Sequence, residues 1–327
     1  MLNSLNRTFL KRDYEILKSK FEVDLISGHS YIDYFKQWRS AKGYAVYFSW
    51  WGTSLHTVLF AKLFGGKSVI VAGGHEVADV PEIPYGIFAT TTLKKHIVRF
   101  VLQTADVVLP VSEVTRKAVL QHAKPKRLRV VYNGVNTAKC KSEGKKENMV
   151  LTVGTISQTT TKVKGLEIFV RSAEYLPDIQ FVLIGQHKDI DSLEHLQTIS
   201  PSNVRIHGYK PFEELLSYYR RAKVYVQVSL HESFGVALAE AMACECVPVV
   251  TKKAALPEVV GDTGFYVPYN NPKATAKAIA EALNAPNKGR EARKRVKEMF
   301  SLQKRTEKLF EVINTLVKNH QTTLSNT

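Results

Sequence analysis

Short apolar runs alternate with longer amphipathic segments through the second half of the chain. The runs, rich in valine and isoleucine, predict strands at 148–156, 179–185, 203–209, 222–230 and 246–251. Between them, apolar residues recur with a helical period and predict helices at 164–176, 189–199, 211–221 and 235–244. Strands that alternate with such helices specify βαβ units, so this half is expected to form a Rossmann-like domain with a parallel sheet.

The first half shows a similar pattern with weaker contrast. Its apolar runs predict strands at 23–27, 44–50, 67–74, 105–112 and 128–135, and its helices are expected near 5–20, 53–64, 92–104 and 112–122. This half therefore predicts a second, smaller parallel sheet, and the fold class is α/β with two facing Rossmann-like domains. Ligands of such sheets bind at the carboxyl ends of the strands, so the cleft between the domains is the expected site.

A polar segment at 137–148 separates the two halves. It is charged and lacks apolar periodicity, as linkers do. We expect a first domain over 1–140, a second domain over 141–300, a C-terminal helix over 301–319 and a disordered tail over 320–327. The last helix carries one apolar stripe and should pack back toward the first domain; the stripe comprises Leu302, Leu309, Val312 and Leu316.

The positive charge of the chain is concentrated in its first half. Residues 1–146 hold 23 Lys and Arg against 11 Asp and Glu, a difference of +12, whereas the remainder holds 23 against 19, a difference of +4. An anionic partner is one explanation: a phosphorylated acceptor, a membrane surface or nucleic acid. A basic face that only aids solubility is the alternative, and the chain has no recognisable DNA or RNA motif, so no nucleic acid is expected. The densest basic groups are Lys94, Lys95 and Arg99; Arg116 and Lys117; and Lys124, Lys126, Arg127 and Arg129.

Cysteine usage and hydropathy indicate the compartment. The three cysteines, Cys140, Cys244 and Cys246, are an odd number in a large chain, which favours buried thiols over a disulfide framework or a metal site. No apolar run reaches the length of a spanning helix, and the N-terminal stretch has no signal-peptide core. We expect a cytoplasmic protein, and its basic half is a candidate for peripheral docking at a membrane.

The segment HESFGVALAE carries two acids eight positions apart. Glu232 lies in the loop after a predicted strand, and Glu240 lies inside the following helix, which is expected to begin near Phe234 or Gly235. The free backbone N–H groups at such a helix start suit phosphate or sugar oxygens. Carboxylates accept hydrogen bonds from hydroxyl groups, so the two acids are better matched to sugar hydroxyls than to phosphate.

This segment resembles the E-x7-E signature of the retaining glycosyltransferases of family 4, which have the GT-B fold. The resemblance continues through TVGTISQTTTKVKGLEIFV, PDIQFVLIG and EAMACECVPVVTKKAALPEVVGDTGFYVP, and it covers nearly all of 148–270. It implies that Glu240 holds the ribose hydroxyls of a nucleotide sugar. It also implies that Glu232 lies by the donor sugar, with the backbone of Ser233, Phe234 and Gly235 near sugar and phosphate.

The resemblance implies that lysines bind the diphosphate of the donor. Lys164 of the K-G pair is expected to neutralise the leaving diphosphate, although a surface lysine at a helix start is the alternative. After Gly154 of the VG turn, the family usually carries an arginine, and here Thr155 stands in its place, so Lys162 becomes the candidate for the second cation. The resemblance also implies that no metal and no cofactor are needed. The chain also departs from glycines preferred by the family at Glu245, Ala254 and Ala255.

In the first half, VIVAGGHEVADVPEIPYG resembles the family segment in which a strand ends at a residue facing the cleft. His75 is therefore a candidate to bind the transferred sugar or the acceptor, and a purely structural histidine is the alternative. We expect the first strand and the glycine-rich loop of the family to be absent or truncated here, with Asn3, Ser4 and Asn6 as the substitute hydrogen-bond donors to the phosphates.

The resulting prediction is a retaining glycosyltransferase that moves a sugar from a nucleotide diphosphate sugar to an acceptor hydroxyl in glycan or glycolipid synthesis. Its catalytic residues would be Glu232, His75 and Lys164. Its partners would be the nucleotide sugar donor and a glycan, lipid or lipid-linked acceptor. The alternative is a catalytically inactive GT-B protein that binds a nucleotide sugar or an anionic partner.

Overall fold

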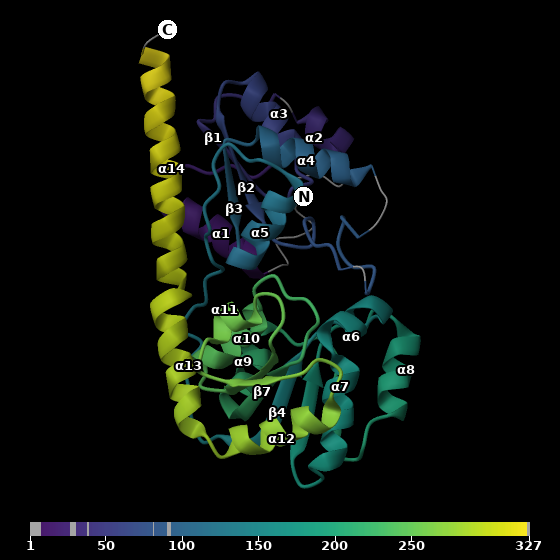
Figure 1. The fold of residues 1–327 in the computed structure, drawn as a ribbon. Helices are drawn as coiled ribbons and strands as arrows, with labels where there is room; N and C mark the ends of the chain where they lie inside the picture. The colour runs from purple at the N-terminus through teal and green to yellow at the C-terminus, as the bar shows by residue number, and fades with distance from the viewer. Residues whose placement is uncertain (1–7, 27–30, 38, 81, 90–92, 326–327) are drawn as a thin grey trace. The chain divides into compact units, whose positions relative to one another are not determined.

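The computed structural model describes residues 8–26, 31–37, 39–80, 82–89 and 93–325 (Figure 1). Its contacts divide the chain into two compact units. The first unit comprises 1–81, 85–134 and 303–327, and the second comprises 82–84 and 135–302.

The second unit contains a six-stranded parallel sheet with strand order β6-β5-β4-β7-β8-β9. All five predicted strands of this half are confirmed, and a short sixth strand, β9, was not predicted. In the centre of the sheet, Val150 of β4 pairs with Phe181 on one side and with Val224 on the other. The strands are β4 (Glu147–Val153), β5 (Gln180–Ile184), β6 (Val204–His207), β7 (Ala222–Gln227), β8 (Val247–Thr251) and β9 (Phe265–Val267).

Helices join these strands and cover the sheet. α7 packs against α12, and α10 packs against α13, with α12 and α13 also touching β8. The predicted helix at 164–176 corresponds to α7 and a short 3₁₀ helix, and a further helix, α6, precedes it; Gly165 takes a left-handed conformation that ends α6 and begins α7. These helices are α6 (Gln158–Lys164), α7 (Leu166–Ser172) and the 3₁₀ helix η1 (Ala173–Tyr175). The other helices are α8 (Ile190–Thr198), α9 (Phe212–Arg221), α10 (Val236–Ala243), α11 (Leu256–Val260), α12 (Pro272–Leu283) and α13 (Pro286–Met299).

The first unit contains a three-stranded parallel sheet in the order β1-β2-β3. Buried apolar residues from α3, α4 and α5 pack against this sheet. The strands are β1 (Val46–Trp50), β2 (Lys67–Ala72) and β3 (Val107–Pro110), and the helices are α1 (Thr8–Lys18), α2 (Tyr31–Lys36), α3 (Leu55–Leu63), α4 (Lys94–Thr104) and α5 (Glu113–His122). No strand precedes β1 in the described part of the chain.

Two strand predictions in this unit are wrong. Residues 23–26 form no strand, and position 27 lies outside the described residues. The segment at 128–135 runs beside β3, where Arg129 N donates to Val108 O at 3.1 Å, but it forms only two isolated bridges, at Leu128 and at Val135. Its ladder stays incomplete because Pro110 of β3 has no backbone N–H to donate to it. Arg305 donates to the carbonyl oxygens of Val131 and Tyr132 at 3.0 and 2.7 Å.

The C-terminal helix α14 (Leu302–Ser325) packs on the first unit, as predicted. Arg305 of α14 pairs with Asp13 of α1, with Nη2 and Oδ2 at 2.6 Å, and both side chains are almost fully buried. Trp50 Nε1 donates to the same carboxylate at 2.9 Å, so the buried charges are well hydrogen-bonded. The helix also continues to Ser325, whereas a disordered tail was expected from residue 320.

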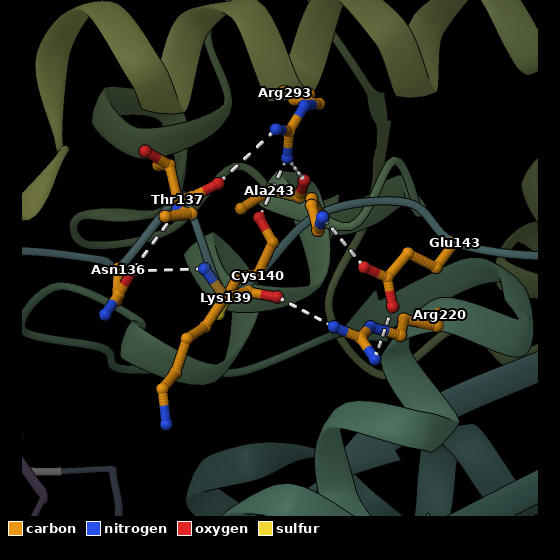
Figure 2. Close-up of polar contacts among 10 residues, drawn as sticks. Asn136, Thr137, Lys139, Cys140, Glu143, Arg220, Ala243 and Arg293 are labelled. Carbon is orange, nitrogen blue, oxygen red and sulfur yellow. Dashed lines mark hydrogen bonds and ion pairs between the residues drawn. The ribbon is translucent and has the colours of Figure 1, made fainter.

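The polar linker is held against the second unit by two arginines (Figure 2). Arg293 of α13 donates to Cys140 O at 2.8 Å, and Arg220 of α9 donates to Lys139 O at 3.1 Å and pairs with Glu143 at 2.7 Å. Asn136 Oδ1 accepts from Lys139 N at 3.1 Å and closes the turn. The second unit accordingly begins at Val135, and the predicted boundary after residue 140 falls inside this anchored segment.

Candidate functional site

The candidate residues of the second unit gather where the strand order reverses. From β4 the chain proceeds through β5 and β6 on one side, and then returns to β7, β8 and β9 on the other. The carboxyl ends of β4 and β7 therefore form the topological switch point, where ligands of open parallel sheets bind. Gly154 and Thr155 follow β4, and the loop from Glu232 to Gly235 follows β7.

Lys164 and Glu232 form an ion pair at this point. Nζ of Lys164 contacts Oε2 of Glu232, and the two side chains are 27% and 13% exposed. The contact depends on Gly165, because a Cβ there would lie 2.2 Å from Val228 O. Lys164 is thus a partly buried, paired cation in the last turn of α6, and the alternative of a surface lysine at a helix start is wrong.

Gln227, at the end of β7, supports Glu232 and was missed in the sequence. Its Nε2 donates to Oε2 of Glu232, the oxygen that also contacts Lys164. Its Oε1 is buried without a hydrogen-bond partner among the described residues. The one available signal was a polar residue in the otherwise apolar run VYVQV. The Gln227 amide fixes the carboxylate of Glu232 and offers an acceptor beside it.

Two tyrosines lie near the acids. Burial raises the pKa of Tyr225 well above its ordinary value, and the charge of Glu232 raises it further. Burial and then the charge of Glu240 do the same to the pKa of Tyr219. Both phenols therefore stay protonated near neutral pH, so neither can act as a base at this site.

Glu240 lies inside α10 and is only 5% exposed. α10 begins at Val236, and Gly235 precedes it with a left-handed φ of 92°. A buried carboxylate is costly unless polar groups compensate it, so Glu240 is unusual among the apolar residues of this helix. Its place agrees with the predicted position in the helix after Glu232.

The loop between the two acids is anchored by Phe234. This side chain is 2% exposed, and its ring meets Phe300 edge to face with a centroid distance of 5.3 Å. Ser233 is half-buried, and Gly235 takes a conformation that favours glycine. Because Phe234 turns its side chain into the core, this loop can contribute to a ligand site through its backbone.

The predicted diphosphate residues are brought together only in part. Gly154 N donates to Ile184 O at 3.0 Å, and Thr155 is half-buried with its carbonyl oxygen bonded to Thr160 Oγ1 at 2.8 Å. Lys162 is exposed, and side chains two positions apart on a helix do not share a face. Lys162 therefore points away from the side of α6 that carries Lys164, and its role as a second cation remains a prediction.

His75 belongs to the first unit, whereas the other candidates belong to the second. It is exposed after β2, and its ring meets Tyr85 edge to face at 5.1 Å. Its backbone oxygen accepts from Ile87 N at 3.1 Å. Asn3, Ser4 and Asn6 lie outside the described residues. Within the described ranges, no group of three or more His, Cys, Asp or Glu is arranged to hold a metal ion.

Two of the residues that replace family glycines have a left-handed backbone. Glu245 has a φ of 64° and Ala254 a φ of 47°. Side chains with a Cβ are strained in this region, by about 1–2 kcal/mol. Ala255 N donates to Glu232 O at 3.1 Å, so the strained turn adjoins the loop that carries the first acid.

Ala254→Gly is expected to stabilise the protein by about 0.5–1 kcal/mol, because relief of the strain exceeds the added chain entropy of glycine. Urea unfolding monitored by circular dichroism measures this change. Ala255→Gly is the matched control, since Ala255 has an ordinary φ of −82°, and it should destabilise. Equal effects of the two substitutions would contradict the assignment of strain.

The chain combines a Rossmann-like unit, which carries an acid, a lysine and a glycine turn at its switch point, with a second parallel α/β unit, and its fold is of the GT-B class of glycosyltransferases. The family model described as glycosyl transferases group 1 matches residues 137–299, and the model described as glycosyltransferase family 4 matches residues 2–139. The chain belongs to this family of glycosyltransferases.

Curated relatives and solved structures agree with this class. An uncharacterised glycosyltransferase of Methanocaldococcus jannaschii is 28% identical over 58% of this chain, and the match spans about half of its own length, 53%. Alpha-maltose-1-phosphate synthase of Mycolicibacterium smegmatis is 27% identical over 77% of this chain and 73% of that protein. HepE of Anabaena, solved in complex with UDP and glucose, has a TM-score of 0.75 at 15% identity, covering 92% of this chain and 88% of that one.

Proposed function

We propose that this protein is a retaining glycosyltransferase that moves a sugar from a nucleotide diphosphate sugar to an acceptor hydroxyl in glycan or glycolipid synthesis. The observation that carries the proposal is the Lys164–Glu232 pair at the switch point of the second sheet. Family membership and the likeness to a structure solved with UDP support it.

In the proposed reaction, the bond between the anomeric carbon and the diphosphate oxygen breaks, and a bond from that carbon to the acceptor oxygen forms on the same face. The acceptor proton passes to the leaving diphosphate. Lys164 stabilises the negative charge that grows on the diphosphate, which is where a fixed cation lowers the barrier most. Glu232 binds the donor sugar and Glu240 the ribose, and no metal is required.

A donor screen tests this function. Thermal shift with UDP-, GDP- and ADP-sugars should raise the melting temperature for one nucleotide class, since a ligand that binds the native state stabilises it. The protein is then incubated with a panel of phosphorylated, glycan and lipid-linked acceptors. Mass spectrometry should show sugar transfer to at least one of them. Binding without transfer to any of them would identify a non-catalytic nucleotide-sugar-binding protein, and no binding would reject the proposal.

We propose that the acceptor is lipid-linked and that the protein binds it at the cytoplasmic surface of a membrane. The surface of α4 supports this, because exposed Leu93 and Phe100 accompany Lys94, Lys95 and Arg99. Apolar side chains beside basic ones are typical of helices that dock on anionic bilayers. Within the described residues, no helix is both long and apolar enough to cross a membrane.

Replacing Lys94 and Lys95 by glutamate is expected to abolish most co-sedimentation with anionic vesicles, because each basic residue near the surface contributes about 1 kcal/mol. The same double change at Lys252 and Lys253, two adjacent exposed lysines of the second unit, serves as the charge-matched control. Equal partitioning of the wild-type protein into anionic and neutral vesicles would exclude electrostatic docking.

A further inference from the structure

A carboxylate is buried beneath the loops that end β1 and β2 in the first unit. Glu76 is 2% exposed. Its Oε1 accepts from Gly73 N at 2.8 Å and from Gly52 N at 3.4 Å, and its Oε2 accepts from Gly74 N at 3.0 Å. Gly52 follows β1 and the other two glycines follow β2, so one side chain ties together two loops that are distant in sequence.

These loops meet at the carboxyl edge of the first sheet. β1 and β2 are parallel neighbours in which Trp50 pairs with Val71, so the loops that begin at Trp51 and Gly73 leave the sheet at the same edge. A Cβ on Gly73 would lie 3.0 Å from Nε1 of Trp51, which shows how closely the indole packs on this loop. The carboxyl edge of a parallel sheet is where its ligands bind.

The backbone here is not one that the chain would adopt by itself. Trp51 has a φ of 70°, and Gly74 has a φ of 116°. A bulky residue in the left-handed region is strained and persists only where surrounding contacts impose it, and such strain clusters at ligand sites. The hydrogen bonds of Glu76 to both loops are contacts of this kind. They fix the position of half-buried Trp51 and of exposed His75.

The chemistry of Glu76 suits an anchor for backbone amides. Burial raises the pKa of Glu76, and the backbone N–H donors of the glycines lower it in part. A carboxylate with two acceptor oxygens matches three converging N–H donors, and charge-assisted bonds are the stronger kind. A glutamine of the same shape would have to turn a donor toward one of the loops.

We propose that Glu76 is a positioning residue for the acceptor: it holds the carboxyl-edge loops of β1 and β2 so that Trp51 and His75 form the acceptor platform of the transferase. The inference rests on the proposed function. It assigns Glu76 a part in acceptor binding and none in donor binding, because its contacts lie wholly in the first unit, whereas the candidate donor residues lie in the second.

Glu76→Gln is the test variant, and Asp106→Asn is its control. Asp106 also accepts a backbone bond, from Ser68 N at 2.9 Å, together with a bond from Ser68 Oγ at 2.9 Å. Its partner Ser68 lies at the amino end of β2, so Asp106 holds the edge of the sheet opposite to the loops that Glu76 holds. Both variants remove a carboxylate that holds a strand terminus, so a loss that is purely structural should affect them alike.

Two measurements are made on the full-length protein. Amide hydrogen exchange by mass spectrometry should speed up roughly tenfold or more at 51–54 and 73–76 in Glu76→Gln and stay unchanged there in Asp106→Asn. With the donor and acceptor pair found in the screen, Glu76→Gln should raise KM for the acceptor roughly tenfold while KM for the donor stays within about twofold. Asp106→Asn should change neither constant.

The outcomes are distinguishable from failure of the proposed function. If the wild-type protein transfers sugar but Glu76→Gln leaves the exchange rates or the acceptor KM unchanged, the role of Glu76 is overturned and the proposed function stands. If both variants raise the acceptor KM equally, the effect is general destabilisation and the role is overturned. If the wild-type protein transfers to no acceptor in the panel, the transferase proposal and the acceptor role fall together.

Discussion

Lys164→Ala is expected to lower kcat by roughly 100- to 1,000-fold, the usual effect of removing one preorganised group that stabilises transition-state charge. The lysine lies at the switch point, held there by Glu232 and by the glycine that follows it. Before the reaction, its charge is balanced by Glu232. As the glycosidic bond breaks, charge grows on the diphosphate, and a cation that is already fixed stabilises it without reorganisation. Affinity for the donor should fall less than kcat, because that charge is greatest in the transition state.

Steady-state kinetics with the donor and acceptor from the screen measure this change. Lys164→Arg keeps the charge with a different geometry and should recover part of the rate. Lys162→Ala removes an exposed lysine from the same short helix and should cost only a few-fold, as expected from a weak surface charge. A loss as large for Lys162→Ala would instead support its role as the second diphosphate cation. Wild-type kcat in Lys164→Ala would refute the proposed role of this residue.

The second unit was predictable because its strands are buried on both faces. β8 is buried at all five positions, and such strands appear in sequence as continuous apolar runs with clear ends. β9 was missed because it has three residues and only Val267 is buried. In the first unit, the apolar runs at 23–27 and 128–135 form no strand in the described residues, and Leu25 of the first run is 45% exposed. Whether such a run joins a sheet depends on its neighbour, as the second run shows where it meets Pro110 of β3.

The residues of the candidate site also divide into those that the sequence marked and those that only the fold reveals. Glu232, Glu240 and Lys164 lie within linear segments that resemble those of the family, so the sequence marked them, and the structure brings Lys164 to Glu232. Gln227 and Glu76 carry no such signal, because their importance arises from hydrogen bonds to loops or side chains placed by the fold. The clustering of Trp51 with Gly73 likewise depends on the pairing of β1 with β2. Positioning residues of this kind can be recognised only after tertiary contacts are known.

Glu240→Gln is expected to weaken binding of the nucleotide by roughly 10- to 100-fold, equivalent to about 1.5–3 kcal/mol for hydrogen bonds to a charged acceptor. Ribose offers two hydroxyl donors, and a carboxylate accepts both, whereas an amide accepts one and presents an N–H group to the other. Isothermal titration calorimetry with the free nucleoside diphosphate measures the change without requiring an acceptor. The rate at saturating donor should fall much less than the affinity, in contrast to the effect of Lys164→Ala.

The controls separate recognition of ribose from general effects on the fold. Glutamine keeps the volume of the buried side chain, so it avoids the cavity that alanine would leave in α10. Glu281→Gln, on the exposed face of α12 in the same unit, makes the same chemical change at the surface and should leave affinity unaltered. The 2′-deoxy nucleotide gives a further check: because it lacks one of the hydroxyls, the penalty of Glu240→Gln should shrink for this ligand if the carboxylate binds ribose. An undiminished penalty would show that Glu240 acts through the packing of α10, and the role of ribose acceptor would have to be given to another residue.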